Sequence, residues 1–530
     1  MKMTYQKRPI GTLLILRTLQ VLGFLAFLGG CSRNQTLAPG KTSPGPAAAT
    51  QSARPSGGEL RIGITTEPAT LDPLSPDNTS DGRSILFNVF EGLVKLTPEG
   101  NFHPAVADLY EIREDGRVYT FRLRPGILFH DGQPVRVEDV VFTLETAMQA
   151  GFNGFDQIDR IAQTTENELS LILKTPDLEF LPYLTIGIVP KANKDREKNP
   201  IGTGPFSIAS YQTQQSLVLE KNPRYWQKGA PHLDKVTYVF IADFDALIRA
   251  LQGGDVDTAH ITSSVAQQLD PSRFDMIPSP SNSVQLLALN NAVPPLNEVL
   301  VRQAICYTVD INEIIDAAFY GIGEPSGSPL IPGLALYYDG SLKNPYPKDI
   351  LKAKELLTKA GHAGGFPLEI TVPANYTIHI DTAQVVVKQL AEVGIAAQIT
   401  LMDWAIWLKE VYQGRNYQAT IISLDAPQAA PRGFLARYHS QARSNFVNFS
   451  SPAYDQVYDA ILEETHEGRR IALYHHAQQI ASSEAASVFI QDIWGFKAFA
   501  KGRFGGAVHY PLYVFDVSTI YRLPPALEAY

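Results

Sequence analysis

The sequence predicts a mixed α/β protein whose folded part is divided into two lobes. With 530 residues, the chain is long for one domain and sufficient for two or three, each with its own core. A hydrophobic fraction of 45% with 19% charged residues excludes a wholly disordered chain. Strand-like alternation and helix-like spacing of apolar residues follow one another along the body, and we find no internal repeat and no second long apolar run.

Residues 1–30 have the features of a secretory signal peptide. All four of their charges are basic, and the apolar run LQVLGFLAFLGG ends in small residues. This run is shorter than the roughly 20 residues that a membrane-spanning helix needs. Cys31 follows directly, so the segment from Leu28 to Cys31 resembles a bacterial lipobox, in which the cysteine is lipidated and becomes the new N-terminus. The alternative is an ordinary signal peptide followed by a chance cysteine.

Residues 31–58 are expected to be the lipidated cysteine and a flexible tether. Ser, Pro, Gly, Ala and Thr dominate this segment, which cannot bury enough apolar surface to offset its ordering entropy. The remaining residues, 59–530, contain 38 bases and 54 acids. This acidic body argues against a nucleic-acid partner and against flat adsorption to anionic lipids, so we expect the lipid to hold the protein at the membrane.

The residue patterns indicate neither a cofactor nor a catalytic site. Two cysteines in the chain exclude a disulfide scaffold and any Cys-rich zinc or iron–sulfur site. With Cys31 lipidated, Cys306 is the other thiol, and its apolar neighbours predict a buried, inert side chain. The chain has no HExxH motif, no GxSxG elbow and no glycine-rich phosphate loop. We therefore expect no cofactor, no metal ligand and no catalytic residue.

The first half of the body is predicted to alternate short strands with helices. Strands are expected where apolar residues alternate, at 60–64, 119–123, 169–173 and 236–241. Helices are expected where apolar residues recur three and four apart, at 137–148 and 246–251.

Residues 366–424 predict a parallel sheet. Strands are expected at 368–372, 395–401 and 417–424, with a helix at 383–393 before Gly394 and a shorter helix at 404–414. Strand–helix–strand units of these lengths give parallel strands with right-handed crossovers. Because ligands bind beyond the carboxyl ends of such strands, Trp404 and Asp425 are candidate ligand contacts.

Seven motifs occur in order along residues 59–525. They are Glu67-Pro68 with Leu71-Asp72-Pro73, Asn88–Leu93, Pro104–Asp108, TFRLRPGILFHDGQPV with EDVVFTLE, Gly202–Phe206, Asn222 with Tyr225-Trp226, and VRQAICYTVDINEII. Together and in this order they resemble the family-5 bacterial extracellular solute-binding proteins, the oligopeptide, dipeptide and nickel receptors of ABC importers.

The resemblance implies the two-lobe fold of type II periplasmic binding proteins, with a ligand cleft between the lobes. Lobe I would comprise residues 59–288 and 495–530, with a subdomain at about 95–200, and lobe II would comprise residues 289–494. The chain would cross between the lobes near Leu289 and near Ile493. The implied protein is a monomeric, non-enzymatic receptor of the bacterial cell envelope, on the periplasmic or extracytoplasmic side, which closes on its solute. It would then dock on a membrane permease with cytoplasmic ATPase subunits.

Three residues are expected to bind ligand. Trp404 matches a pocket tryptophan of the relatives, where an aromatic wall buries ligand side chains; its alternative is a core position. In peptide-binding relatives an Asp-Pro carboxylate binds the peptide ammonium, and a tryptophan ends the preceding strand. Here Leu424 and Ala430 replace these two residues. Asp425 either supplies the carboxylate from a shifted position or caps the loop, and Arg432 either binds a ligand carboxylate or phosphate or is solvated.

The leading hypothesis is a lipid-anchored receptor for a short peptide or similar polar solute. A second hypothesis keeps the same fold but assigns nickel or another metal, bound as a chelate, as the ligand. A third is a surface hydrolase or sensory adaptor that does not supply a transporter.

Overall fold

The computed structural model describes residues 55–78, 80–425, 430–510 and 514–524. The predicted signal peptide, Cys31 and most of the tether lie outside these ranges. The described residues belong to one compact unit, Ala53–Tyr530. Within them, no helix has both the length and the apolar character needed to cross a membrane.

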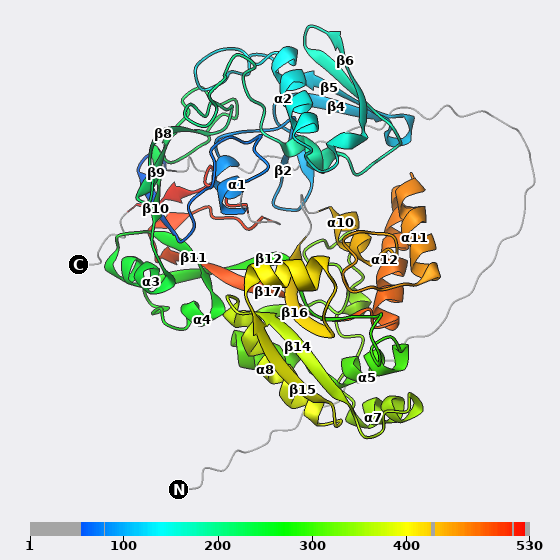
Figure 1. The fold of residues 1–530 in the computed structure, drawn as a ribbon. Helices are drawn as coiled ribbons and strands as arrows, with labels where there is room; N and C mark the ends of the chain where they lie inside the picture. Colours follow the sequence, from blue (N-terminus) through cyan, green and yellow to red (C-terminus); the bar gives the residue numbers. More distant parts are fainter. Residues whose placement is uncertain (1–54, 79, 426–429, 511–513, 525–530) are drawn as a thin grey trace, which may run out of the picture. The chain divides into compact units, whose positions relative to one another are not determined.

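Two long strands, β12 (Phe274–Leu289) and β17 (Ser487–Ala500), pair with each other within an eleven-stranded sheet (Figure 1). From β17 the sheet continues through β11 (Thr258–Thr262), β1 (Glu59–Ile64), β10 (Lys235–Phe240), β9 (Ser216–Lys221) and β8 (Phe206–Gln212). From β12 it continues through β16 (Ala419–Asp425), β14 (Pro367–Pro373) and β15 (Ala396–Met402), while β13 (Gly323–Pro325) also pairs with β17. The segments predicted for lobes I and II are thus joined through β12 and β17.

The lobe I part of the sheet has an apolar core on each face. One core includes side chains of α3 (Phe244–Gly253) and α4 (Ser263–Ala266). The other includes side chains of α1 (Ser80–Leu86) and of the C-terminal segment with β18 (Phe504–Gly505) and β19 (Tyr521–Arg522). The predicted strands at 60–64 and 236–241 and the helix at 246–251 are confirmed, within one residue at each end for the strands and two for the helix.

The subdomain contains an antiparallel sheet in the order β4-β5-β7-β6 and has its own core. Its main elements are β4 (Ala107–Arg113), β5 (Val118–Leu123), α2 (Val137–Gln149), β6 (Ile158–Thr165) and β7 (Glu168–Leu173). A hairpin of β2 (Val94–Leu96) and β3 (Phe102–Pro104) precedes it, and the short helix η3 (Leu181–Thr185) follows it. The strands predicted at 119–123 and 169–173 and the helix predicted at 137–148 are all present.

The lobe II part contains the predicted parallel strands, because β14 pairs in parallel with both β15 and β16. The core on one face includes α5 (Val299–Thr308), α6 (Ile311–Phe319), α7 (Ile350–Lys359) and α8 (Thr377–Ala391). The other core includes α9 (Trp404–Trp407), α10 (Pro431–Leu435), α11 (Pro452–Glu463) and α12 (Glu467–Ser483). Helix α8 starts six residues before the predicted helix, and the helix predicted at 404–414 is α9 followed by a π-helical stretch, Leu408–Gln413.

The motifs that carry the resemblance hold the fold together. The buried Glu91 carboxylate accepts hydrogen bonds from the Tyr225 hydroxyl (2.6 Å) and from Trp226 Nε1 (2.8 Å), so two motifs meet at one side chain. Arg302, also buried, donates to three backbone carbonyl oxygens. A buried polar group needs such partners, which explains why these residue types occur inside the protein.

Candidate functional site

The aromatic residues after β15 form a stack that ends at Trp404. The carboxylate of Asp403 accepts hydrogen bonds from two backbone N–H groups and so begins α9. Trp404, 37% exposed, stacks on Trp407 with ring centroids 5.2 Å apart and planes 9° apart. Trp407 is 2% exposed and donates from Nε1 to Thr420 Oγ1 at 3.0 Å. Trp407 is therefore a core residue, and it supports the partly exposed face of Trp404 from below.

A chain of contacts connects this stack to Asp425. Tyr412 stacks on Trp407 at 6.3 Å, and its hydroxyl accepts a hydrogen bond from Arg437 Nη1 at 3.1 Å. The other terminal nitrogen of Arg437 donates to the backbone oxygen of Asp425 at 2.8 Å. Trp404 and Asp425 thus belong to one connected layer near the carboxyl ends of β15 and β16.

Asp425 is the last residue of β16, where it pairs with Ser283 of β12. Its side chain is half-buried, and no group in the described part of the chain donates a hydrogen bond to its carboxylate. Residues 426–429 lie outside the described ranges. Ala430, which stands where relatives were expected to have an aspartate, is buried.

Arg432 of α10 contacts the subdomain. Its Nη2 lies 2.7 Å from Asp177 Oδ2 and donates to the Tyr183 hydroxyl at 3.1 Å. Burial lowers the pKa of the Arg432 guanidinium, but the adjacent Asp177 carboxylate reverses this and holds the pKa above its ordinary value. The guanidinium is therefore paired with a carboxylate from the other predicted lobe.

Glu179 also takes part in the contact between lobe II residues and the subdomain. Its Oε1 accepts a hydrogen bond from the Tyr474 hydroxyl at 2.5 Å and lies 3.4 Å from Arg470 Nε, both on α12. Its Oε2 lies 4.0 Å from Arg432 Nε. Burial raises the pKa of the Glu179 carboxyl, whereas Tyr474 and the two guanidinium groups act in the opposite direction.

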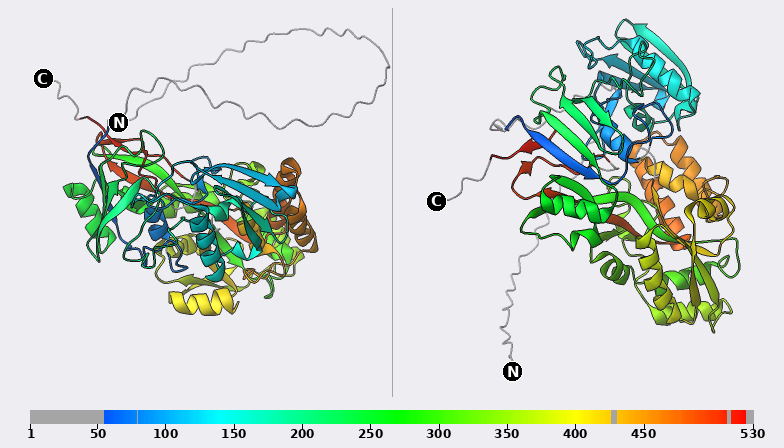
Figure 2. Two further views of the ribbon diagram at one scale, coloured as in Figure 1. Left: turned by 90° about the horizontal axis from the view of Figure 1, so that it is seen from above. Right: turned by 60° about the vertical axis from the view of Figure 1, so that its left-hand side comes forward.

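We call Asp177, Glu179, Arg432, Arg470 and Tyr474 the interlobe cluster. Figures 1 and 2 show the subdomain beside α10, α11 and α12, from which the cluster's lobe II members come. Its two carboxylates and two guanidinium groups balance each other in charge. Buried ion pairs are stable only when their geometry and hydrogen bonds compensate for the lost hydration, and here the partners come from opposite predicted lobes.

Arg432 was predicted from the sequence as a ligand contact, whereas the other members of the interlobe cluster were not predicted. Arg470 and Tyr474 are four residues apart on α12, a spacing that places them on one face of the helix. Asp177 and Glu179 lie between β7 and η3, and nothing in the local sequence distinguishes them from solvated loop acids.

The strands that join the lobes carry a buried acid. The register of β12 and β17 shifts between Pro280 and Val284, opposite Asp492. Asp492 Oδ1 accepts a hydrogen bond from Ser281 Oγ at 3.1 Å, and burial raises the pKa of this carboxyl to about 7. The crossing expected near Ile493 falls in this region, whereas Leu289 ends β12 inside a lobe II core. The lobe boundaries remain a prediction.

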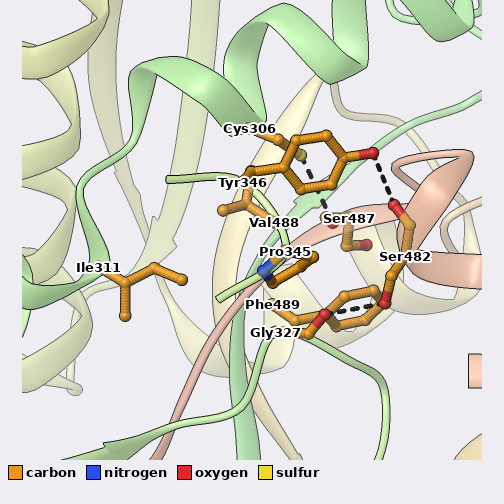
Figure 3. Close-up of a pocket in the computed structure, with 9 residues that line it drawn as sticks. All are labelled: Cys306, Ile311, Gly327, Pro345, Tyr346, Ser482, Ser487, Val488 and Phe489. Atoms are coloured by element: carbon orange, nitrogen blue, oxygen red, sulfur yellow. Dashed lines mark hydrogen bonds between the residues drawn. The ribbon is translucent and has the colours of Figure 1, made fainter. Parts of the chain in front are cut away.

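A small cavity in the predicted lobe II is lined in part by Cys306 (Figure 3). Its volume of about 10 Å³ matches a single water molecule, so it has no room for a solute. Cys306 is buried, as predicted, and desolvation raises the pKa of its thiol to about 12, which keeps it unreactive. Across the described ranges, no three His, Cys, Asp or Glu side chains converge in a metal-binding arrangement.

Comparison with known proteins identifies solute-binding proteins. A sequence profile of the bacterial extracellular solute-binding proteins, family 5 (middle region), matches residues 101–446. The glutathione-binding protein GsiB of Pectobacterium atrosepticum is 28% identical over 455 residues, which are 81% of this chain and 87% of GsiB.

Two solved structures are similar in fold and sequence. The ABC transporter substrate-binding protein CtaP of Listeria monocytogenes has a TM-score of 0.80 and 26% identity, over 88% of this chain and 100% of CtaP. The binding protein AgaA of A. tumefaciens R10, solved with agropinic acid, has a TM-score of 0.71 and 28% identity, over 88% of this chain and 99% of AgaA. The α/β fold with two lobes is the fold of these neighbours.

Proposed function

Because this chain belongs to the bacterial extracellular solute-binding proteins of family 5, we propose that it captures a short peptide or similar polar solute for an ABC importer. The observation that carries this proposal is the interlobe cluster, which joins the predicted lobes. Its Arg432 lies in the chain between Asp425 and Arg437, which both belong to the layer that contains Trp404. The similarity to a glutathione-binding protein and to a receptor solved with agropinic acid supports a small polar solute.

Lobe closure is the proposed mechanism. With the lobes apart, the charges of the interlobe cluster are hydrated; with the lobes together, they pair. A solute that contacts both lobes binds the closed protein more tightly than the open protein, and this difference in affinity favours closure. A shift from a mostly open to a mostly closed protein requires a difference of about 5 kcal/mol. The closed protein then docks on a permease powered by cytoplasmic ATPase subunits.

Each candidate residue has a defined role in this mechanism. The partly exposed face of Trp404 covers an apolar part of the solute. The Asp425 carboxylate accepts hydrogen bonds from a solute ammonium. Arg432 uses donors that Asp177 leaves free to bind a carboxylate or phosphate of the solute.

We further propose that the mature protein is a non-enzymatic monomer anchored in the cell envelope through lipid on Cys31. Replacing this residue, Cys31→Ser, should release the protein from the membrane fraction and remove the lipid mass from its N-terminal peptide. Membrane retention of this variant would argue against the anchor. A solute recovered unchanged after release from the protein would support a receptor without catalysis.

A thermal-shift screen of the purified soluble body tests the solute class. Di-, tri- and tetrapeptides, glutathione and nickel–histidine form the panel, because a ligand that binds only the native state must raise its stability. Stabilisation by peptides at micromolar concentration supports the proposal. Selective stabilisation by nickel–histidine would replace it with a metal-chelate receptor, and turnover of a bound compound would replace it with a hydrolase.

A further inference from the structure

Lys497 of β17 is a buried cation with no counter-ion among the described residues. The residue is 7% exposed, and its strand neighbours are His260 of β11 and Ile277 of β12. In the described part of the chain, no hydrogen bond or ion pair reaches its ammonium group, which lies over the face of the Phe515 ring, 4.7 Å from Nζ to the centroid. Desolvation lowers the pKa of Lys497 to about 8.

Two histidines lie within the electrostatic influence of this ammonium. Desolvation, reinforced by the charge of Lys497, lowers the pKa of His260 and of His509 to about 4, so both rings are neutral at pH 7. The Nδ1 atom of His509 is buried and has no hydrogen-bond partner among the described residues. Each neutral imidazole has one N–H to donate.

His260 shows that this group of residues opens to solvent. Its side chain is exposed, and in the register of β11 and β17 His260 is paired with Lys497. A Cβ atom at Gly495, which shares a face with Lys497, would lie 3.1 Å from His260 Nε2 and 2.6 Å from the Ile261 carbonyl oxygen. The absence of a side chain at Gly495 therefore gives the His260 imidazole room beside β17.

A buried ammonium that has no counter-ion among the described residues lowers the stability of the folded protein. A buried charge normally has an opposite charge beside it, and burying one without a partner is unfavourable by several kcal/mol. The contacts of Lys497 with Ile277 and Phe515 would suit an apolar side chain equally well. An unused charge of this kind is characteristic of a ligand site.

We infer that Lys497, His260 and His509, which we call the Lys497 cluster, bind a carboxylate of the solute. The ammonium supplies the opposite charge, and the two imidazole rings supply additional N–H donors. This inference rests on the proposed function and narrows it. Lobe I would receive the anionic group of the solute, while Asp425 of lobe II would receive its ammonium, as a zwitterionic peptide requires.

The test uses matched probes with and without the carboxylate. Binding of tri- and tetra-alanine is compared with that of their C-terminal amides, and thermal stabilisation by millimolar succinate is compared with that by succinamide at equal ionic strength. The proteins are the wild type, Lys497→Met and the control Lys501→Met, which makes the same change at an exposed lysine four residues away.

The wild type and Lys501→Met should prefer the acid over the amide at least tenfold, and Lys497→Met should lose this preference. Removal of the unpaired charge should also raise the melting temperature of Lys497→Met by several degrees. A purely structural lysine would give the opposite result, a lower melting temperature with the acid preference unchanged. If Lys497→Met does not fold, His260→Ala, at an exposed position, should reduce the preference severalfold.

The two sets of probes separate this inference from the proposed function. Peptides that bind equally as acids and amides would overturn the carboxylate site and leave the peptide receptor intact. Stabilisation by succinate that depends on Lys497, without peptide binding, would support the site and overturn the peptide proposal. The absence of both effects would overturn both.

Discussion

The interlobe cluster and the Lys497 cluster both bury cations, but they differ in what surrounds them. Arg432 has Asp177 at 2.7 Å, whereas no carboxylate among the described residues reaches Lys497. Burial acts to lower the pKa of both cations. Asp177 reverses this effect at Arg432, and nothing reverses it at Lys497, where the pKa falls to about 8.

Charges that are paired hold the protein in one arrangement, whereas an unpaired charge remains available to bind an anion. A compensated cluster between lobes stabilises the arrangement in which its partners meet. An uncompensated cation lowers the stability of the protein until an anion arrives. Both clusters desolvate a cation. At Arg432 the cation is paired, which indicates a contact that closes the lobes, whereas at Lys497 it is unpaired, which indicates a contact for the solute.

The largest effect is expected from breaking the interlobe cluster. Arg432→Met leaves Asp177 and Glu179 without one of their cations in the closed arrangement. Truncating one partner of a buried ion pair costs about 2–5 kcal/mol, so solute affinity should fall by at least tenfold. Calorimetry measures the affinity, and small-angle scattering of the solute-free protein should show a shift towards open lobes.

Asp177→Asn is the matched test of why Arg432 matters. If Arg432 acts by holding the lobes together, this variant should lose as much affinity as Arg432→Met, and the double variant should lose little more. If Arg432 acts on the solute, Asp177→Asn frees its guanidinium and should strengthen the binding of anionic solutes. A gain in affinity would thus contradict the closing role.

Replacing the buried acid on the connecting strand should have the next largest effect. The folded-state pKa of Asp492, about 7, lies above its unfolded value of about 4, so the folded protein holds a proton that the unfolded chain has lost between these values. Stability should therefore decrease as pH rises from 4 to 7, by up to roughly 4 kcal/mol from this group.

Asp492→Asn keeps an oxygen for Ser281 and removes the titration. The variant should be more stable than the wild type at pH 7 and no more stable at pH 4, as urea unfolding at the two values would measure. A stability difference independent of pH would contradict the raised pKa.

Periodicity predicted the elements of this fold better than it predicted the site. Leu368, Ile370 and Val372 occupy alternate positions, a pattern that is visible in the local sequence, and β14 forms where it was expected. The sequence placed Trp404 and Asp425 beyond strand ends for the same reason. The partners of Arg432 come from a loop about 250 residues earlier, and pairing of that kind depends on the tertiary fold. Lys497 is one of two charged residues in a largely apolar strand, and only the structure shows that its described neighbours lack an anion.

The stability contribution of Lys497 should have the opposite pH dependence. Its folded pKa of about 8 lies below the unfolded value of about 10.4, so the unfolded chain binds more protons between these values. Stability should rise through this range by up to roughly 3 kcal/mol, and the full penalty should be present below pH 8. Lys497→Met should therefore be more stable than the wild type at pH 7, and this advantage should shrink by pH 10. Equal stability of the two proteins at pH 7 would show that the ammonium finds an anion or water there.

The smallest effect is expected at Trp404, and it should appear in binding alone. Trp404 is 37% exposed and stacks on Trp407, so Trp404→Ala removes a ligand-covering surface and leaves the core beneath it in place. Lost aromatic burial of the solute should cost about 1.4 kcal/mol or slightly more, which is at least a tenfold decrease in affinity. Trp407→Ala is the matched control, because removal of this buried ring should cost about 3–5 kcal/mol of folding stability. Calorimetry and thermal unfolding of both variants separate the two roles, and an unchanged affinity in Trp404→Ala would show that this ring serves only to cover Trp407.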